Sequence, residues 1–311
     1  MEETLTPEQW TAKNRKRIPP EWILGLIAIV AAIGLVAMIA VSLPYIFAEE
    51  DDPEIYIHQS HQNEAYVPEE TAPAETEAAE PTEPTIPPEA NPYGRLDFQY
   101  NRNNYLLCQR QESYPGVDVS AFQGTIDWQK VADSGIKFAM IRLGYRGYGK
   151  AGKMVVDEYA QQNLEGAKEA GLAVGAYFFS QALTIQEVDE EIEFLLEVLG
   201  DFELDMPLVL DWEQITVDGS RTAVMDARTL TDLQLHYCKT ITEMGYTPMI
   251  YFNWHQSTRL MHLTELEAYP FWLALYQDRM TYPYKVEMWQ YTDKGQVPGI
   301  QGDVDINVYM P

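Results

Sequence analysis

Cysteine and histidine are both scarce in this chain, which limits the chemistry it can perform. The 311 residues include two cysteines, Cys108 and Cys238, which provide no disulfide framework, and whether they pair stays open. The five histidines form no cluster with cysteine at metal-ligand spacing. We therefore expect no cofactor and no His/Cys metal site, although Asp and Glu side chains can hold Mg²⁺ or Ca²⁺.

Basic residues are also few. The chain has 21 Lys plus Arg against 48 Asp plus Glu, a formal net charge of −27, so we expect no nucleic-acid partner. The imbalance is greatest from Glu49 to Gly94, where 13 acidic residues and eight prolines occur without a single Lys or Arg. Such a composition cannot bury enough apolar surface to fold, so we predict an extended acidic linker over residues 48–111.

One long apolar run lies near the N-terminus, from Trp22 to Phe47, and it contains no charged side chain. At about 1.5 Å per residue it can cross a hydrocarbon core of roughly 30 Å, so we predict a transmembrane helix over residues 22–47 in the lipid bilayer. Basic residues precede the run and acidic residues follow it, which predicts a cytoplasmic tail over residues 1–21 and an extracellular C-terminal domain at the cell membrane. A cleaved signal peptide is the alternative, but the run is longer than a typical signal core and no clear cleavage motif follows.

From about Tyr114 onward, short β-rich segments alternate with helical patterns. The β-rich segments that a helical pattern follows are 116–120, 137–145, 173–180, 206–213 and 247–253, and those that lack one are 271–276, 286–292 and 304–309. We predict an α/β fold over residues 112–311, a (β/α)5β3 TIM-like barrel whose last three strands have no helices. A doubly wound open sheet is the alternative, but "GVDVSAFQG" at the first strand is not the glycine-rich phosphate turn which that fold would need.

The segment "PLVLDWEQI" ends an apolar strand with two acids, Asp211 and Glu213. Because side chains alternate along a strand, both acids share one face, which we predict to be the barrel interior. The same alternation places Asp118 and Asp305 on inward faces of the first and last strands. A cap or turn would explain one such acid, but four converging carboxylates indicate an active site in which one group stays protonated as a general acid. Glycoside hydrolysis is the reaction that best fits them.

Polar and aromatic residues on the predicted strands are candidates for sugar contacts, because aromatic faces stack on sugar rings. The candidate substrate-binding residues are Tyr177, Tyr251, Trp272, Tyr276, Trp289 and Gln290. Buried aromatic residues are more often simple core, and sequence alone does not separate the two roles.

Six motifs follow one another in order: "YPGVDVSAFQGTIDWQKVADSGIKFAMIRLGY", "VGAYFFSQA", "PLVLDWE", "MIYFNW", "FWLALY" and "MWQYTDKGQVPGIQGDVDINVY". With this order and spacing the region after the linker, about 195 residues, resembles the glycoside hydrolase family 25 lysozymes, also called the Chalaropsis-type N-acetylmuramidases. One departure is Phe178, since relatives often carry His at that place.

The resemblance implies a (β/α)5β3 barrel that cleaves the β-1,4 bond between N-acetylmuramic acid and N-acetylglucosamine in peptidoglycan. It implies Glu213 as the general acid and Asp211 as the group that stabilises positive charge or orients the substrate's acetamido group. Asp118 and Asp305 would tune pKa values and bind sugar. The route stays open between a covalent intermediate, acetamido participation and inversion. Two other functions also stay open: a non-catalytic glycan-binding surface module, and a hydrolase of another N-acetylhexosamine polymer such as chitin.

Overall fold

The computed structural model describes residues 87–311. The predicted cytoplasmic tail (1–21), the predicted transmembrane helix (22–47) and the linker up to residue 86 lie outside this range. Within residues 87–311, no helix combines the length and the apolar character that crossing a membrane requires.

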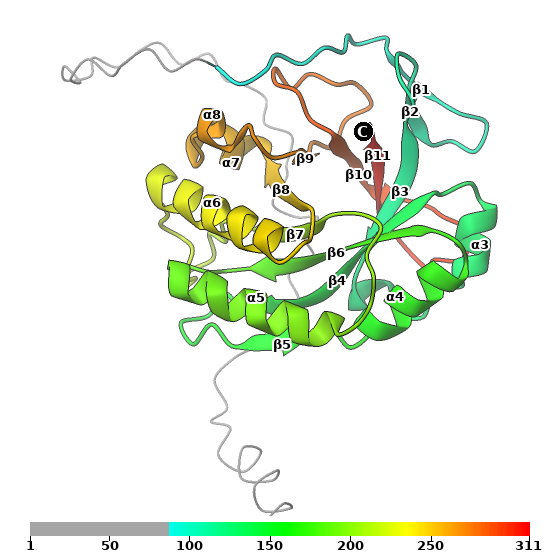
Figure 1. The fold of residues 1–311 in the computed structure, drawn as a ribbon. Helices are drawn as coiled ribbons and strands as arrows, with labels where there is room; N and C mark the ends of the chain where they lie inside the picture. The colour runs from blue at the N-terminus through cyan, green and yellow to red at the C-terminus, as the bar shows by residue number, and fades with distance from the viewer. Residues whose placement is uncertain (1–86) are drawn as a thin grey trace, which may run out of the picture. The chain divides into compact units, whose positions relative to one another are not determined.

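Eight strands form a closed barrel (Figure 1). In chain order they are β3 (Tyr114–Val119), β4 (Phe138–Arg146), β6 (Ala173–Ser180), β7 (Leu208–Trp212), β8 (Pro248–Asn253), β9 (Phe271–Ala274), β10 (Met288–Gly295) and β11 (Val304–Tyr309). Successive strands from β3 to β10 pair in parallel. Strand β11 runs antiparallel to both β10 and β3, and so closes the barrel. The predicted mixed α/β fold with an eight-stranded barrel is confirmed.

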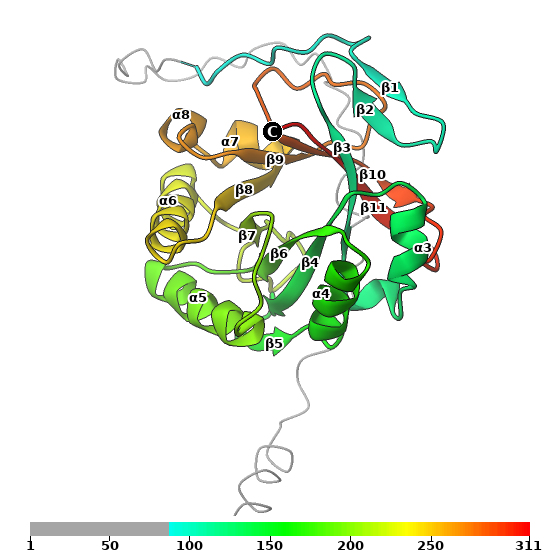
Figure 2. The same ribbon diagram turned by 45° about the vertical axis from the view of Figure 1, so that its right-hand side comes forward.

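Helices occupy the first five connections between barrel strands, and they surround one side of the barrel (Figure 2). They are α3 (Trp128–Asp133), α4 (Ala160–Glu169), α5 (Ile185–Leu199), α6 (Ala227–Glu243) and the short pair α7 (Trp254–Arg259) and α8 (Leu263–Leu266). A 3-10 turn, η2 (Ala121–Gln123), follows β3, and β5 (Met154–Val156) pairs antiparallel with the end of β4. No helix of the described chain follows β9 or β10, as the sequence pattern predicts.

Helix α5 shows how local sequence sets these elements. It begins after Thr184, whose side chain accepts a hydrogen bond from the backbone N–H of Glu187, and it ends at Gly200, where φ is 56°. Its fully buried apolar residues recur every three or four positions, which gives the helix one face to pack on the barrel. They are Val188, Ile192, Leu195 and Leu199.

Strand side chains divide into an inner and an outer apolar cluster. In β7, Val209 belongs to the small cluster that fills the barrel, whereas Leu208 and Leu210 belong to the large cluster beneath the helices. This division confirms the alternation predicted for β7. Phe178 of β6 also lies in the outer cluster, packed edge-on against Phe194 of α5, so the departure from the family's usual His lies outside the barrel interior.

The end of the predicted linker differs from our expectation. Strands β1 (Phe98–Tyr100) and β2 (Leu106–Cys108) form an antiparallel hairpin, and Phe98, Leu106 and Cys108 are buried. Phe98 packs edge-on against Trp289 of β10, with ring centroids 5.1 Å apart. The hairpin therefore covers a side of the barrel where the last strands have no helices of their own.

The chain just before this hairpin is also tied to the barrel. The N–H of Asn91 donates to the carbonyl of Pro283 at 2.9 Å, and the N–H of Lys285 donates to the carbonyl of Glu89 at 2.8 Å. Residues 89–110 thus belong to the folded domain, and the predicted linker boundary at residue 111 lies too far along the chain. Cys108 and Cys238 are both buried free thiols, so they do not pair.

Candidate active site

The four predicted carboxylates come together at the end of the barrel where the parallel strands finish. Asp118 is the penultimate residue of β3, Asp211 is the penultimate residue of β7, and Glu213 follows that strand directly. These three side chains are nearly buried, with residue exposures of 3%, 3% and 7%. Asp305 is the second residue of the antiparallel β11 and lies opposite Asp118 in the β3–β11 register.

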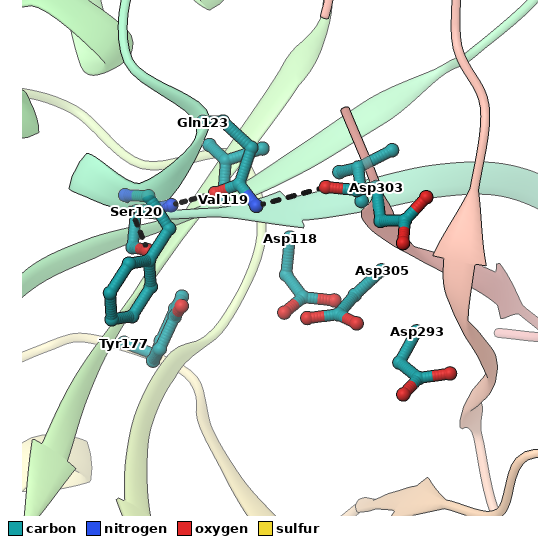
Figure 3. A pocket seen from close by; sticks show the side chains of 10 residues that line it. Asp118, Val119, Ser120, Gln123, Tyr177, Asp293, Asp303 and Asp305 are labelled. Atoms are coloured by element: carbon teal, nitrogen blue, oxygen red, sulfur yellow. Dashed lines mark hydrogen bonds between the residues drawn. The ribbon is translucent and has the colours of Figure 1, made fainter. Parts of the chain in front are cut away.

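Asp118 and Asp305 form a carboxyl pair, and Figure 3 shows their side chains directed toward one another. Burial raises the pKa of Asp305 well above its ordinary value, and the neighbouring charge of Asp118 raises it further. Burial also raises the pKa of Asp118, but hydrogen bonds from Gln290, Asn307 and Asp305 oppose that rise. Of the two groups, Asp305 therefore holds a proton more tightly, and Asp118 accepts its hydrogen bond.

A network of buried polar groups fixes Asp118. Its Oδ2 accepts hydrogen bonds from Gln290 Nε2 at 2.9 Å and from Asn307 Nδ2 at 2.6 Å. Gln290 Oε1 in turn accepts from the hydroxyls of Tyr251 and Tyr276, both at 3.2 Å. These buried hydrogen bonds hold the Asp118 carboxylate in one orientation.

Glu213 has the environment of a general acid. Burial raises its pKa to about 7, the charge of Asp118 raises it as well, and a hydrogen bond with the Tyr251 hydroxyl lowers it. A carboxyl group with such a pKa is half protonated at neutral pH, which suits donation of a proton to a leaving oxygen. Burial raises the pKa of Tyr251, and the charges of Glu213 and Asp211 raise it further, so both acids lie close to this tyrosine.

Tyr177, one of the predicted substrate-binding residues, lies beside the carboxyl pair. Its side chain lines the same pocket as Asp118 and Asp305 (Figure 3), and burial raises its pKa well above the ordinary value. The nearby cation of Arg142 opposes that rise. Arg142 lies on β4 beside Tyr177 of β6, and its Nε donates to Asp157 Oδ2 at 2.8 Å.

Two predicted substrate-binding tryptophans have buried positions with no face open to a sugar. Trp289 is fully buried in the outer cluster against the β1–β2 hairpin, and its indole N–H donates to the carbonyl of Leu275 at 2.7 Å. Side chains alternate along β10 and Gln290 faces inward, so Trp289 faces away from the carboxylates. Trp272 does lie inside the barrel, but it is 1% exposed and donates to Asn307 Oδ1 at 2.8 Å, so it supports the Asp118 network and offers no face to a sugar.

Sequence reasoning missed three groups at the site. Asn307 holds Asp118, and the alternation of β11 already placed it on the inward face. Asp293 lines the pocket from the end of β10, and its charge contributes to the raised pKa of Asp305. Arg142 is the third, and one arginine within the apolar "KFAMIRLGY" was the available signal.

The fold and this site define a class of enzyme. A closed α/β barrel that gathers buried carboxyl groups at one end, with the pKa of one of them raised to about 7, has the side chains that a glycosidase needs. In agreement with this class, the sequence matches the model of Glycosyl hydrolases family 25 over residues 117–300, and the chain belongs to that family.

Similar sequences come from several bacteria. The "Uncharacterized protein YegX" of Escherichia coli (strain K12) is 32% identical over 211 residues, which cover 62% of this chain and 68% of that protein. Lysozyme M1 of Streptomyces globisporus is 27% identical over 216 residues, which cover 62% of this chain and 67% of that protein.

Among solved structures, the modular autolysin LytC from Streptococcus pneumoniae in complex with a synthetic peptidoglycan ligand matches with 25% identity and a TM-score of 0.57. The match covers 68% of this chain and 52% of that chain. This chain therefore spans about half the length of that autolysin.

Proposed function

We propose that this chain is a Chalaropsis-type N-acetylmuramidase, which hydrolyses the β-1,4 bond between N-acetylmuramic acid and N-acetylglucosamine in peptidoglycan. The observation that carries the proposal is the convergence of Asp118, Asp211, Glu213 and Asp305 at one end of the barrel, with the Glu213 pKa raised to about 7. The names of two relatives in the family, Lysozyme M1 and an autolytic lysozyme of Clostridium acetobutylicum, support the same substrate class.

In this mechanism Glu213 donates its proton to the glycosidic oxygen as the bond to the muramic acid C1 breaks. Positive charge develops on the sugar ring at that moment, and Asp211 stabilises it or orients the acetamido group beside it. The charged Asp118, fixed by Gln290 and Asn307, binds sugar and holds up the Glu213 pKa through its negative charge. Asp305 keeps its proton and positions Asp118.

The test is digestion of purified peptidoglycan and of chitin, side by side, by the full-length protein and a Glu213→Gln variant. Release of soluble fragments from peptidoglycan alone, lost in the variant, is the expected result. Release from chitin instead would identify a hydrolase of another N-acetylhexosamine polymer. Tight binding to peptidoglycan without release by either protein would identify a glycan-binding module.

We further propose that residues 22–47 anchor the enzyme in the cell membrane, with the catalytic domain outside and acting on the cell's own wall during remodelling. The support is the uncharged apolar run, with basic residues before it and acidic residues after it. Extraction of membranes with alkaline carbonate tests the anchor: the full chain should stay in the membrane pellet, and a variant without residues 22–47 should not. Recovery of the full chain in the soluble fraction would contradict it.

A further inference from the structure

The backbone at Glu213 leaves the barrel ladder just where the proposed general acid must be aimed. Pairing between β6 and β7 ends at Ser180 and Trp212, and pairing between β7 and β8 ends at Leu210 and Ile250. Glu213 therefore lies one residue beyond the strand, at the start of a long loop that reaches α6. Strand pairing alone does not fix its position.

A buried side-chain amide, that of Gln181, holds the backbone at this point. Gln181, which follows β6 directly, is fully buried, and its Nε2 donates to the carbonyl of Glu213 at 2.7 Å and to the carbonyl of Ser180 at 2.9 Å. Its Oε1 accepts from the Thr222 hydroxyl at 2.7 Å. Both donors and the acceptor of one side chain are thus occupied.

Thr222 closes the arrangement from the far end of the loop. Its hydroxyl oxygen accepts a hydrogen bond from the backbone N–H of Ile215 at 3.0 Å while the hydroxyl donates to Gln181. The main chain on either side of Gln214 is therefore held by one buried pair of side chains. A second amide, Gln256 Nε2 from α7, donates to the carbonyl of Trp212 and fixes the residue before Glu213.

We propose that Gln181, together with Thr222, is a positioning residue that holds the backbone of Glu213 and thereby aims its carboxyl group at the substrate. The inference rests on the proposed function for the reaction that it serves, but the geometry at Glu213 is independent of the substrate. Gln181 touches no reacting atom in this role. It acts through the main chain of the general acid.

The consequence of losing this amide is specific. Without it the loop moves, and a displacement of about 1 Å at a catalytic group can lower the rate by roughly 100-fold. A looser loop also admits water to the Glu213 carboxyl group. Hydration favours the charged form, so the Glu213 pKa should fall toward its ordinary value.

The test compares four full-length variants with the wild type. Gln181→Met keeps the volume and removes all three hydrogen bonds, and Thr222→Val removes the hydroxyl, whereas Thr222→Ser keeps it. Gln234→Met is the matched control, because Gln234 is an equally buried glutamine on α6 with no side-chain hydrogen bond within the described chain. A thermal unfolding curve for each variant establishes that it is folded at the assay temperature.

The expected results are a kcat about 10- to 100-fold lower for Gln181→Met with KM within about twofold of wild type, and a basic limb of the pH–rate profile moved to lower pH. Thr222→Val should change both in the same direction, and Thr222→Ser and Gln234→Met should match the wild type. A wild-type kcat and pH profile for Gln181→Met, or an equal loss in Gln234→Met, would overturn the proposal.

A measurement without substrate separates this inference from the proposed function. The carboxyl resonance of Glu213, assigned by comparison with Glu213→Gln, gives its pKa by NMR titration in the wild type and in the Gln181 and Thr222 variants. A lower pKa in Gln181→Met and Thr222→Val supports the positioning role even if the wild type proves inactive on peptidoglycan. If the wild type is active and both variants keep its kcat and its Glu213 pKa, the positioning role is refuted while the proposed function stands.

Discussion

The carboxyl group of Glu213 is the proposed general acid, and its ionised form destabilises the folded protein because it is buried. Its pKa of about 7 in the folded protein lies above its ordinary value of 4.5, so the folded state holds the proton more tightly than the unfolded chain does. The stability that the protonated group contributes is fully present below about pH 4.5. It is lost as the pH rises toward 7, because the ionised form is then buried.

Replacement of Glu213 by Gln should therefore stabilise the protein only where Glu213 is charged. We expect a gain of about 3 kcal/mol in the free energy of unfolding above pH 7 and no gain below pH 4.5, at about 1.36 kcal/mol for each pKa unit. Urea unfolding between pH 4 and pH 8 measures this, with Glu267→Gln at an exposed position as the control. A gain that does not depend on pH would show that the Glu213 carboxyl group is not the cause.

The carboxyl pair makes a second prediction at this scale. Asn at position 305 can donate to Asp118 as the protonated Asp305 does, so Asp305→Asn should keep activity within about tenfold of wild type. Asp118→Asn removes the negative charge, and it can keep its oxygen toward Gln290 and Asn307 only by turning its NH2 toward the proton of Asp305. It should therefore lose at least about 100-fold in kcat and about 1 to 3 kcal/mol of stability. Kinetics and unfolding of both variants measure this, and equal losses would contradict the assignment of the proton to Asp305.

At the scale of elements, the β1–β2 hairpin stabilises the side of the barrel that has no helices. Phe98 is 6% exposed and packs on Trp289, so Phe98→Ala should cost about 3 to 5 kcal/mol of unfolding free energy. Leu96, on the same segment, is 85% exposed, so Leu96→Ala should change stability by no more than about 0.5 kcal/mol. Equal effects in denaturant unfolding would mean that the hairpin is not part of the folded unit.

The elements also show how far sequence reasoning reaches. Alternation was sufficient to place Asp118, Asp211 and Asp305 on inward faces, since a buried strand has a strict period of two. The hairpin escaped detection because its strands have three residues each, too short for any period to show, and they follow a long acidic stretch. Its stability comes from distant contacts such as Phe98 with Trp289.

The same limit explains the errors in the candidate site. Trp289 and Gln290 are neighbours in β10, so only one of them can face the interior, and the choice depends on register with β9 and β11. The hydrogen bonds that hold the Glu213 backbone join Gln181 to Glu213, 32 positions away, and to Thr222, 41 positions away. No local sequence pattern encodes such pairs. Fold and carboxylates follow from periodicity, whereas the groups that orient the carboxylates follow from tertiary packing.

At the scale of the whole molecule, the catalytic region is strongly acidic. Residues 111–311 contain 30 Asp plus Glu and 14 Lys plus Arg, a net charge of −16. A domain of this charge is repelled by an anionic cell wall, so long-range attraction does not bring it to such a substrate. A membrane tether that holds the domain beside its substrate would remove the need for such attraction.

This charge predicts an unusual salt dependence. Salt screens repulsion over a Debye length of about 10 Å at 0.1 M, so digestion of peptidoglycan sacculi by the protein in solution should accelerate between about 0.01 and 0.15 M NaCl. Turbidity loss at constant pH measures the rate, and a neutral soluble glycan fragment as substrate is the control that should show little change. A rate that falls with salt on sacculi would contradict the repulsion.

The identity of the glycosidic bond cleaved in peptidoglycan tests the proposed muramidase activity most directly. Mass spectrometry of the soluble fragments that the full-length protein releases from purified peptidoglycan, before and after borohydride reduction, identifies the sugar at each new reducing end. We predict reducing N-acetylmuramic acid, with release lost in Glu213→Gln. Reducing N-acetylglucosamine, or release that survives in the Glu213→Gln variant, would contradict a muramidase whose general acid is Glu213.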